Sequence, residues 1–374
     1  MLPVWQRLLQ PHVESGAVVA VGVVQEQHPD RIRLYAQWRK LGWPVFVDAL
    51  NLLDHQVVPI IVGINASGLV VMPSMRPDDL DVFLAKDFAP REHATPALPH
   101  PLAADAFFHA GKLDEAVAAY AAVVDKEAGD ARAQFRLGVA LLRRFESDAR
   151  KPGDAQAAVG AWTRALALRP DQYIWRRRIQ QYGPRLDKPY NMFGWIEEAR
   201  GEIRDRGDEP VALAVEPRGT ELVGREPVPT VQRAEPDREG KVPRDEAGLA
   251  EVEPVVTPAR VRPGARVRVR LVFRVPKAFW NNEADPIAVH VAARGPFVLV
   301  EGNFAHPVPE EAETREERVL EFELAVADGA RPGLHDLPAY ALYNVCEKVG
   351  GQCLFLRRDF TFPVHVDPDA PKIQ

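Results

Sequence analysis

Two cysteines are the residues of this sequence best suited to chemistry. Cys346 and Cys353 are separated by six residues that include Gly350-Gly351, a turn signal, so the flanking segments are predicted to form a hairpin that brings the sulfurs within bridging distance. Closing so short a loop stabilises a fold by only about 2.5 kcal/mol on the chain-entropy account, and a structural staple gains more from a longer span. Three states stay open: a pair that exchanges disulfides, an inert staple, or two reduced thiols.

Exchange requires a sulfur that is accessible and easily ionised. A thiolate needs exposure and a nearby cation, and the cations close in sequence are Lys348, Arg357 and Arg358. These three side chains are therefore the expected activators of the pair.

The surroundings of the cysteines resemble a known domain. A strand that ends in Tyr343-x-x-Cys346, a short loop, a second cysteine and a strand that reaches Pro363 resemble the amino-terminal domain of the thiol-disulfide interchange protein DsbD. The resemblance implies an immunoglobulin-like β-sandwich in which Cys346 and Cys353 are the catalytic, exchanging pair and Tyr340 and Tyr343 shield the sulfurs. It also implies a protein partner that is itself a thiol-disulfide exchange protein.

Other chemistry has little support in the sequence. The ten histidines are scattered, with no His-x-x-x-His and no Cys-x-x-Cys, so we expect no bound metal. No glycine-rich phosphate loop and no Gly-x-Ser-x-Gly elbow occurs, so we expect no cofactor.

The elements that must position these residues fall into four segments. The first, residues 1–90, is predicted to have α/β structure, because two strands flank a helix and an Asn65-Ala66-Ser67-Gly68 turn then joins an antiparallel hairpin. Its expected elements are a strand at Val18–Val24, a helix at Pro29–Leu41, a strand at Pro44–Val47, a hairpin of Val57–Ile64 with Leu69–Met72, and a helix that opens at Pro77.

This order, together with Leu2-Pro3-Val4-Trp5 and with Val58-Pro59 at the entrance to the hairpin, resembles the redoxins, which have the thioredoxin fold. The resemblance implies a cis-proline at Pro59 and a substrate-binding backbone at Val58, whereas proline at the start of an edge strand is the plainer interpretation. Redoxins carry Cys-x-x-Cys at the start of the first helix, but no cysteine precedes Cys346. The fold is therefore predicted to be truncated, through a start codon assigned too far downstream or through degeneration to a non-catalytic copy, and the chain as given has no complete active site.

The second segment, residues 98–206, is predicted to be helical and to contain a repeat. Ala110-Gly111 through Ala116, followed by Tyr120, recurs as Pro152-Gly153 through Ala158, followed by Trp162. This pattern resembles tetratricopeptide repeats, which implies helical hairpins that serve in docking or spacing. Two repeats are fewer than a free-standing array needs, so the helices are expected to lean on a neighbour.

The third and fourth segments differ in apolar content. Residues 207–255 are rich in Pro and Glu and are predicted to be a linker with one strand at Val211–Val215. Residues 256–368 are predicted to form the sandwich, because short alternating segments recur between turns. Between Arg266 and Arg274, apolar residues alternate with arginines, which predicts a row of cations on a solvated sheet face.

Composition limits the partners and the location. The net charge is -6, from 47 basic and 53 acidic residues, so nucleic acid is not an expected partner. The longest apolar run is far too short to span a bilayer, so no membrane span is expected. No export signal is visible, which predicts a cytoplasmic location, or a periplasmic or extracytoplasmic one if the true N-terminus lies upstream.

These observations support two functions. The first is a bacterial-type accessory protein of thiol-disulfide exchange, an oxidoreductase in which Cys346 and Cys353 exchange disulfides with a partner. The alternative is a non-catalytic protein-protein interaction scaffold that uses the tetratricopeptide-like helices.

Overall fold

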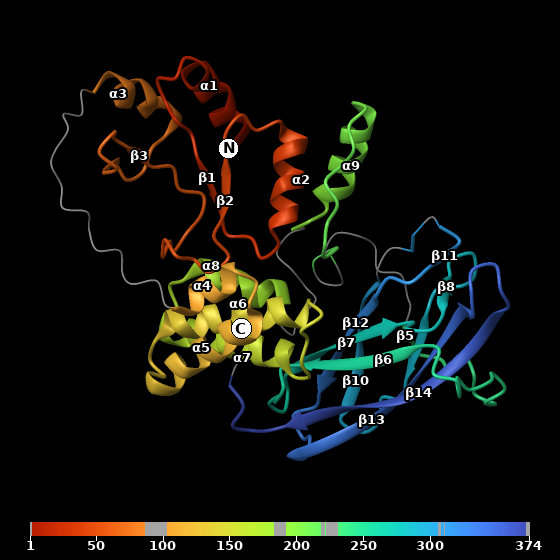
Figure 1. The fold of residues 1–374 in the computed structure, drawn as a ribbon. Coiled ribbons are helices and arrows are strands. Elements are labelled where there is room, and N and C mark those ends of the chain that lie inside the picture. Colours follow the sequence, from red (N-terminus) through yellow and green to blue (C-terminus); the bar gives the residue numbers. More distant parts are fainter. Residues whose placement is uncertain are drawn as a thin grey trace. The chain divides into compact units, whose positions relative to one another are not determined.

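The computed structural model describes the chain except for residues 1, 87–102, 183–191, 218–220, 222–230, 306–307, 310 and 372–374, and the side chains of 301–305. It contains helices and several β-sheets, so the chain is a mixed α and β multidomain protein (Figure 1). Two compact units are present: Met1–Arg144 with Arg164–Arg176 and Ile196–Val215, and Phe145–Thr163 with Arg177–Trp195 and Glu216–Gln374. The predicted boundaries at residues 90 and 98 lie outside the described residues.

The amino-terminal elements of the first unit follow one another in the expected order. They are α1 (Leu2–Glu14), β1 (Gly22–Val24), α2 (Pro29–Arg39), β2 (Val45–Val47), β3 (Gly63–Ile64), β4 (Val70–Met72), η1 (Pro77–Asp79) and α3 (Leu80–Ala85). β1 and β2 pair in parallel and β3 and β4 pair antiparallel, as expected. The two pairs form separate two-stranded sheets.

The expected strand at Val57–Ile64 was wrong over most of its length, because only Gly63 and Ile64 form β3. Val57 and Val58 are about half exposed, at 52% and 51%, so this apolar run is not a buried strand. Pro59 also has no N–H to donate to a β-ladder. The predicted turn is present, and Asn65 closes it by accepting the N–H groups of residues 67 and 69 at 3.1 and 2.9 Å.

The helices that follow among the described residues are α4 (Ala103–His109), α5 (Leu113–Lys126), α6 (Ala131–Phe145), α7 (Asp154–Leu168), α8 (Tyr173–Tyr182) and α9 (Trp195–Asp205). The repeat seen in the sequence has a structural counterpart. Gly111 and Gly153 have positive φ angles, 72° and 88°, shortly before α5 and α7, and such angles favour glycine. The small and aromatic positions that follow, Ala116 with Tyr120 and Ala158 with Trp162, are fully buried.

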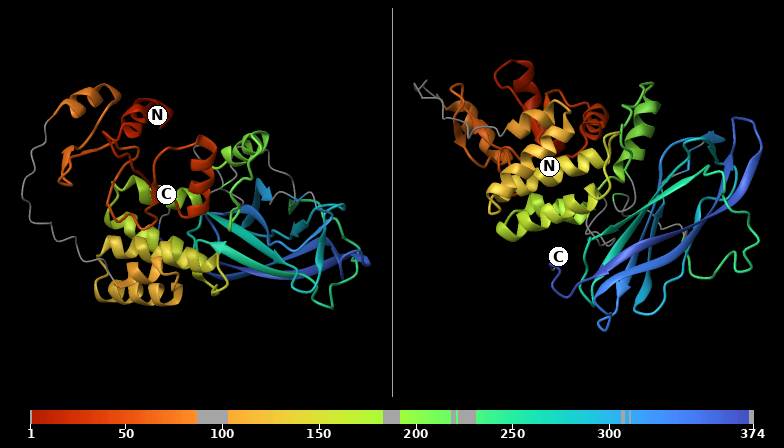
Figure 2. Two further views of the ribbon diagram at one scale, coloured as in Figure 1. Left: turned by 45° about the horizontal axis from the view of Figure 1, so that its top comes forward. Right: turned by 60° about the horizontal axis from the view of Figure 1, so that its bottom comes forward.

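The second unit contains two β-sheets. One has the order β10-β12-β7-β6, and the other has the order β11-β8-β13-β9-β5 with β14 paired to β13 (Figures 1 and 2). One hydrophobic cluster combines residues of both sheets, among them Phe273, Phe322 and Phe362. The strands are β5 (Val231–Gln232), β6 (Glu251–Thr257), β7 (Arg266–Arg274), β8 (Phe279–Asn281), β9 (Ala288–Val291), β10 (Phe297–Ala305), β11 (Glu313–Thr314), β12 (Arg318–Val326), β13 (Gly333–Cys346) and β14 (Cys353–Val366).

The predicted linker contains structure that its composition concealed. β5 pairs in parallel with β9, and β6 pairs with β7, so Val231–Gln232 and Glu251–Thr257 belong to the sheets. The strand expected at Val211–Val215 does not form; instead the N–H of Val211 donates to the side chain of Gln37 at 2.9 Å. The buried apolar residues of these strands, Val231, Val255 and Val256, are few and are set among polar residues and proline, so the composition of the segment did not reveal them.

The prediction of a solvated arginine face on β7 was wrong. Arg268 and Arg270 are only 3% and 8% exposed, and Glu321 on β12 is completely buried. Arg270 donates to Glu321 at 2.6 Å, and the guanidinium of Arg268 lies 3.7 Å from the same carboxylate and donates to the carbonyl of Tyr182. Arg150, before α7, and Tyr182, the last residue of α8, contact charged groups of this face, which a pattern of alternation along one strand cannot reveal.

The arginines and glutamates on this face pair in three groups, named here together the arginine–glutamate ladder. Its pairs are Arg266 with Glu323 (2.9 Å), Arg268 and Arg270 with Glu321, Arg274 with Glu253 and Glu317 (2.9 Å each), and Arg150 with Glu317 (3.0 Å) and Glu253 (3.4 Å). Burial lowers the pKa of Arg268 to about 10, although Glu321 opposes this change. Burial alone would also lower the pKa of Arg270, but Glu321 raises the pKa of that guanidinium above its ordinary value.

Replacing Glu321 by Gln is expected to lower the free energy of unfolding by about 3–5 kcal/mol, because two buried guanidinium groups lose their shared counter-charge. Urea unfolding at neutral pH measures the change. The control is Glu239→Gln, which removes an exposed carboxylate paired with Lys241 and should change stability by less than about 0.5 kcal/mol. Equal unfolding midpoints for the two variants would show that the ladder does not stabilise the fold.

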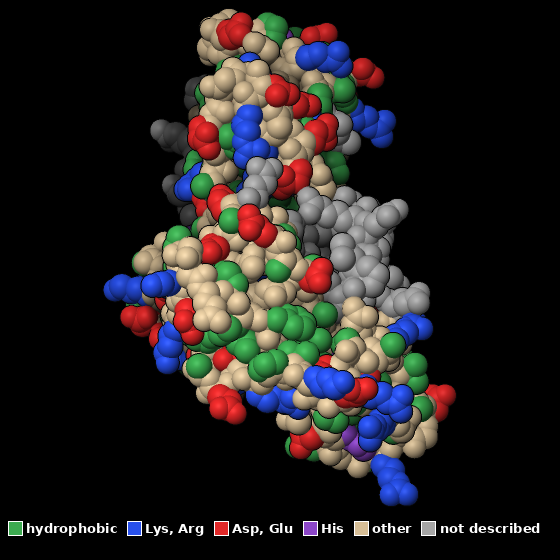
Figure 3. Space-filling view, turned by 90° about the vertical axis from the view of Figure 1, so that its right-hand side faces the viewer, with side chains coloured by type: hydrophobic (Ala, Val, Ile, Leu, Met, Phe, Trp, Pro, Cys, Tyr) green, Lys and Arg blue, Asp and Glu red, His purple; other side chains and the backbone are tan. Residues whose placement is uncertain are grey.

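The surface shows the mixed charge that the composition implies. Acidic and basic side chains are interspersed over the face drawn in Figure 3. No helix in the described part of the chain has the length and apolar character needed to cross a membrane.

Candidate functional site

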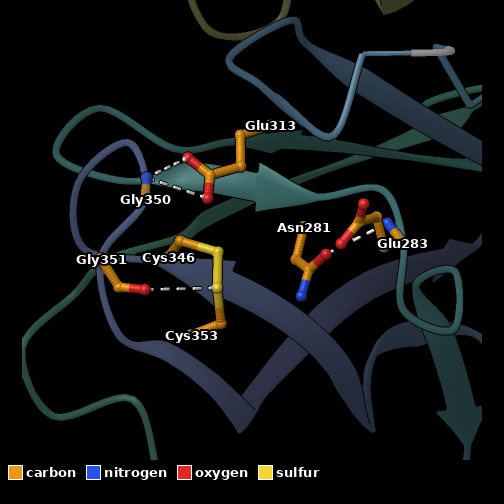
Figure 4. The surroundings of a disulfide bond; sticks show 7 residues. All are labelled: Asn281, Glu283, Glu313, Cys346, Gly350, Gly351 and Cys353. Atoms are coloured by element: carbon orange, nitrogen blue, oxygen red, sulfur yellow. Dashed lines mark hydrogen bonds between the residues drawn. A yellow bond between two sulfur atoms is a disulfide. The ribbon is translucent and has the colours of Figure 1, made fainter.

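The cysteine pair lies where the long hairpin of β13 and β14 ends. Cys346 is the last residue of β13, Cys353 is the first of β14, and the two stand directly opposite each other. They form a disulfide with a Cα–Cα distance of 3.9 Å (Figure 4). Of the three states left open by the sequence, the structure contains the bridged one.

Hydrogen bonding in the hairpin explains why these two positions meet. The N–H of Glu347 donates to the carbonyl of Gln352 at 3.2 Å, so the next pair along, Cys346 with Cys353, occupies a position without mutual backbone bonds. Opposed side chains approach most closely at such positions in an antiparallel ladder. The turn closes through Gly351 N–H, which donates to Lys348 at 2.8 Å, and Gly350 adopts a left-handed φ of 63°.

The two sulfur-bearing residues differ in accessibility. Cys346 is completely buried, whereas Cys353 is exposed. A thiolate from solvent therefore has access to Cys353 and not to Cys346. This asymmetry gives the two residues different chemical roles, because attack occurs at the accessible sulfur.

A carboxylate that the sequence analysis did not consider lies beside the disulfide. Glu313 on β11 accepts the N–H of Gly350 with both carboxylate oxygens, at 3.2 and 3.1 Å (Figure 4). A carboxylate oxygen and the two sulfurs all lie within 4.8 Å of one another. Glu313 precedes Cys346 by more than 30 residues, so no local motif connects them, and only the pairing of β11 with β8 and of β8 with β13 brings them together.

Two of the three expected activating cations serve elsewhere. Arg357 binds Asp237 and Asp359 at 2.9 and 2.7 Å and lies 3.6 Å above the ring of Tyr340, while Arg358 donates to the carbonyl of Asp245. At about 3.4 Å per residue, they lie some 14–17 Å along β14 from the disulfide. Their assignment as activators was wrong, and of the three candidates only Lys348, an exposed residue of the turn, lies in the hairpin end itself.

The two tyrosines expected to shield the sulfurs make their hydrogen bonds to the segment before β6. Successive residues of a strand point to opposite faces, so Tyr343 points away from the side that carries Cys346. Its ring packs edge-on to Trp280, and its hydroxyl donates to Asp245 at 2.7 Å. Tyr340 shares the face of Cys346 but lies six residues away, where its hydroxyl accepts the N–H of Asp237 at 3.0 Å. The tyrosines anchor the segment before β6 to the sheet.

Asp245 is central to that anchor. Its carboxylate accepts the N–H groups of Leu249 and Ala250, both at 2.9 Å, in addition to the hydroxyl of Tyr343. Burial alone would raise the pKa of Asp245, but these hydrogen bonds outweigh it and hold the pKa below its ordinary value. Burial and the Asp245 carboxylate raise the pKa of Tyr343 well above its ordinary value.

Val58 and Pro59, expected to bind substrate, lie in the first unit, whereas the cysteine pair lies in the second. The peptide bond between them is cis, the geometry that the redoxin resemblance implied. Val58 and Pro59 therefore belong to a different compact unit from the cysteine pair.

Comparison with known proteins adds little. No protein family matches the chain, and no curated protein matches it. Among solved structures, AvmM, which catalyses macrocyclization in alchivemycin A biosynthesis, is 8% identical with a TM-score of 0.19, covering 35% of this chain and 97% of that chain. The alkylpurine DNA glycosylase AlkC of Pseudomonas fluorescens, bound to DNA with an abasic site analog, is 10% identical with a TM-score of 0.14, covering 62% of this chain and 52% of that one. At these TM-scores neither similarity supports a conclusion about fold or function.

Replacing Asp245 by Asn is expected to lower the free energy of unfolding at pH 7 by about 1–3 kcal/mol, because three donors lose a charged acceptor. The folded-state pKa of Asp245 is depressed, so its contribution is present above its unfolded pKa of about 3.9 and is lost as the pH falls through the lower folded value. The stability difference between wild type and variant should therefore shrink below about pH 4. Urea unfolding at a series of pH values measures it, and a difference that stays constant down to pH 2 would contradict this assignment.

Proposed function

We propose that the protein is a thiol-disulfide exchange protein whose Cys346–Cys353 disulfide is reduced or formed by a partner protein. The observation that carries the proposal is the asymmetry of the pair, with Cys353 exposed and Cys346 buried beside it. An accessible sulfur allows intermolecular attack, and a protected second sulfur favours resolution within the molecule over capture by solvent thiols.

The exchange has two balanced steps. A partner thiolate attacks Cys353 Sγ, the bond between the two sulfurs breaks, and Cys346 leaves as a thiolate that takes up a proton. A second thiol of the partner then attacks its own sulfur in the mixed disulfide and releases Cys353. The partner dithiol is oxidised to a disulfide, and the pair gains two electrons and two protons. The reverse sequence oxidises the pair.

Family resemblances support this proposal. We infer that the two-sheet domain is immunoglobulin-like and related to the amino-terminal domain of DsbD, because its cysteines close the end of a long hairpin. We infer a thioredoxin-like fold for the first elements from their order. We infer tetratricopeptide-type hairpins for α4–α8 from the repeated glycine, alanine and aromatic positions.

The free edge of β14 offers a way for an extended peptide to reach the sulfur. Cys353 and Phe355 occupy positions whose N–H and C=O groups point away from β13, as does Arg357, which bonds to Pro243 and Asp245. Within the described part of the chain, no backbone group bonds to the outward groups of residues 353 and 355. Phe355 is 47% exposed. A partner segment with a cysteine and an apolar neighbour can pair here by β-augmentation.

The variant Phe355→Pro tests this mode of approach. It removes an outward N–H, while the backbone hydrogen bonds between β14 and β13 are kept. Pro363 already occupies an equivalent outward position. The rate of exchange with a reduced cysteine-containing peptide should fall about tenfold, the effect of losing one hydrogen bond, while the rate with glutathione stays unchanged. Phe355→Ala keeps the N–H and controls for the lost ring. Equal peptide rates for the proline and alanine variants would exclude pairing at this edge.

Redox equilibration tests the function itself. In glutathione buffers of known potential, counting free thiols by mass tagging should give a midpoint between about -120 and -270 mV, the range of exchange proteins. Single-cysteine variants give a matched comparison: Cys346→Ser, which keeps the exposed thiol, should form a mixed disulfide with glutathione, and Cys353→Ser should not. A midpoint below about -300 mV, or equal labelling of both variants, would make the pair structural.

The alternative is a non-catalytic interaction scaffold that uses the tetratricopeptide-like helices. The observation that favours it is the burial of the repeated positions Ala116 with Tyr120 and Ala158 with Trp162, as in packed helical hairpins. On this alternative, a variant without either cysteine would keep its protein partner, whereas the exchange function requires at least one of them for trapping.

A further inference from the structure

The cysteine pair and Glu313 form a group of possible metal ligands that the sequence analysis did not foresee. Of the residues that the structure describes, these three are the one set whose ligand atoms of this kind gather within 4.8 Å. The donors come from three strands, β11, β13 and β14, and therefore have a fixed framework. The Glu313 carboxylate is held in place by the N–H of Gly350.

We propose that, when the disulfide is reduced, Cys346, Cys353 and Glu313 bind one zinc ion. This inference rests on the proposed function only in requiring that the bridge can be reduced. Two thiolates with one carboxylate form a soft, anionic donor set that suits zinc and does not suit magnesium or calcium. Three protein ligands leave a fourth, open position, and the exposure of Cys353 places that position toward solvent.

The geometry requires a small movement. Zinc–sulfur bonds of about 2.3 Å in a tetrahedral site place two sulfurs about 3.8 Å apart, and zinc–oxygen bonds of about 2.0–2.2 Å place the oxygen at a similar distance. The sulfurs must lose their covalent bond and separate, which reduction permits. Cys353 is exposed on an edge strand, so its side chain can turn without displacing the core.

Binding in the reduced state also resolves an electrostatic conflict. Reduction without a metal places up to two thiolates beside a carboxylate, and like charges at such distances disfavour ionisation. A divalent cation compensates these charges. In atoms and electrons, two glutathione thiols reduce the bridge to two protein thiols and form oxidised glutathione; zinc then displaces the two thiol protons.

Cobalt(II) titration of the full-length protein tests the site directly. The protein is reduced with dithiothreitol, freed of reductant without oxygen, and titrated with cobalt(II) while the thiolate-to-cobalt charge-transfer band is recorded. One equivalent should bind to the reduced protein and be displaced by zinc, and the disulfide form should not bind. Glu313→Gln should weaken binding at least tenfold, and Cys353→Ser should abolish the band.

The matched control is Glu283→Gln, which changes another carboxylate of the same neighbourhood that is not among the three ligands (Figure 4). It should bind cobalt as the wild type does, and thermal unfolding of each reduced variant shows whether it is folded. Unchanged affinity in folded Glu313→Gln, or no binding by the reduced wild type, overturns the proposal.

The midpoint potential separates this proposal from the exchange function. Measured with a chelator, it tests exchange alone. With free zinc above the dissociation constant, the reduced state is stabilised, so the midpoint should rise by about 30 mV for each tenfold increase in free zinc. A midpoint in the exchange range that does not respond to zinc would refute the metal site and leave the exchange function standing. Because the cobalt titration uses protein reduced by a strong dithiol, it remains decisive even if glutathione fails to reduce the bridge.

Discussion

The antiparallel pairing of β13 with β14 is the constraint on which the candidate site depends. The register runs without interruption from Gly333 opposite Val366 to Cys346 opposite Cys353. Because side chains alternate between faces, a slip of one residue would place the cysteines on opposite faces of the hairpin. The rest of the domain fixes this register, since β8 and β9 pair with the other edge of β13 and Tyr343 is tied to Asp245.

A second constraint acts on the opposite sheet. The arginine–glutamate ladder leaves β7 and β12 with charged side chains on a covered face. Removing so many charges from water is costly, and pairing with opposite charges offsets this cost. Each guanidinium of the ladder pairs with a carboxylate, and Arg268 also donates to the carbonyl of Tyr182. Only a covering segment with polar partners fits this face, because an apolar helix in the same place would bury charged groups without hydrogen-bond partners.

Much of the secondary structure could be predicted from the sequence, and the reasons differ from element to element. The strands near β7 and β12 were visible because alternation reports the two faces of a strand. The hairpin of the cysteines was visible because Gly350 adopts a left-handed turn conformation that the sequence signals. The solvation of the arginines was not visible, because alternation separates faces but does not say what covers them. Glu313 was missed for a related reason, since its proximity arises from the order of strands in the sheet.

The residues that cover the arginine–glutamate ladder determine where the two-sheet domain begins in the sequence. Residues 145–163 and 177–195 belong to the same compact unit as the strands, and so do β5, β6 and the anchor at Asp245. A fragment cut at the apparent start of the sandwich would lose β6 and expose Glu321 and its arginines to water. The helical residues and the strands therefore form one structural unit rather than independent modules. A version of this domain transplanted into another protein would have to carry residues 145–163 and 177–195 with it.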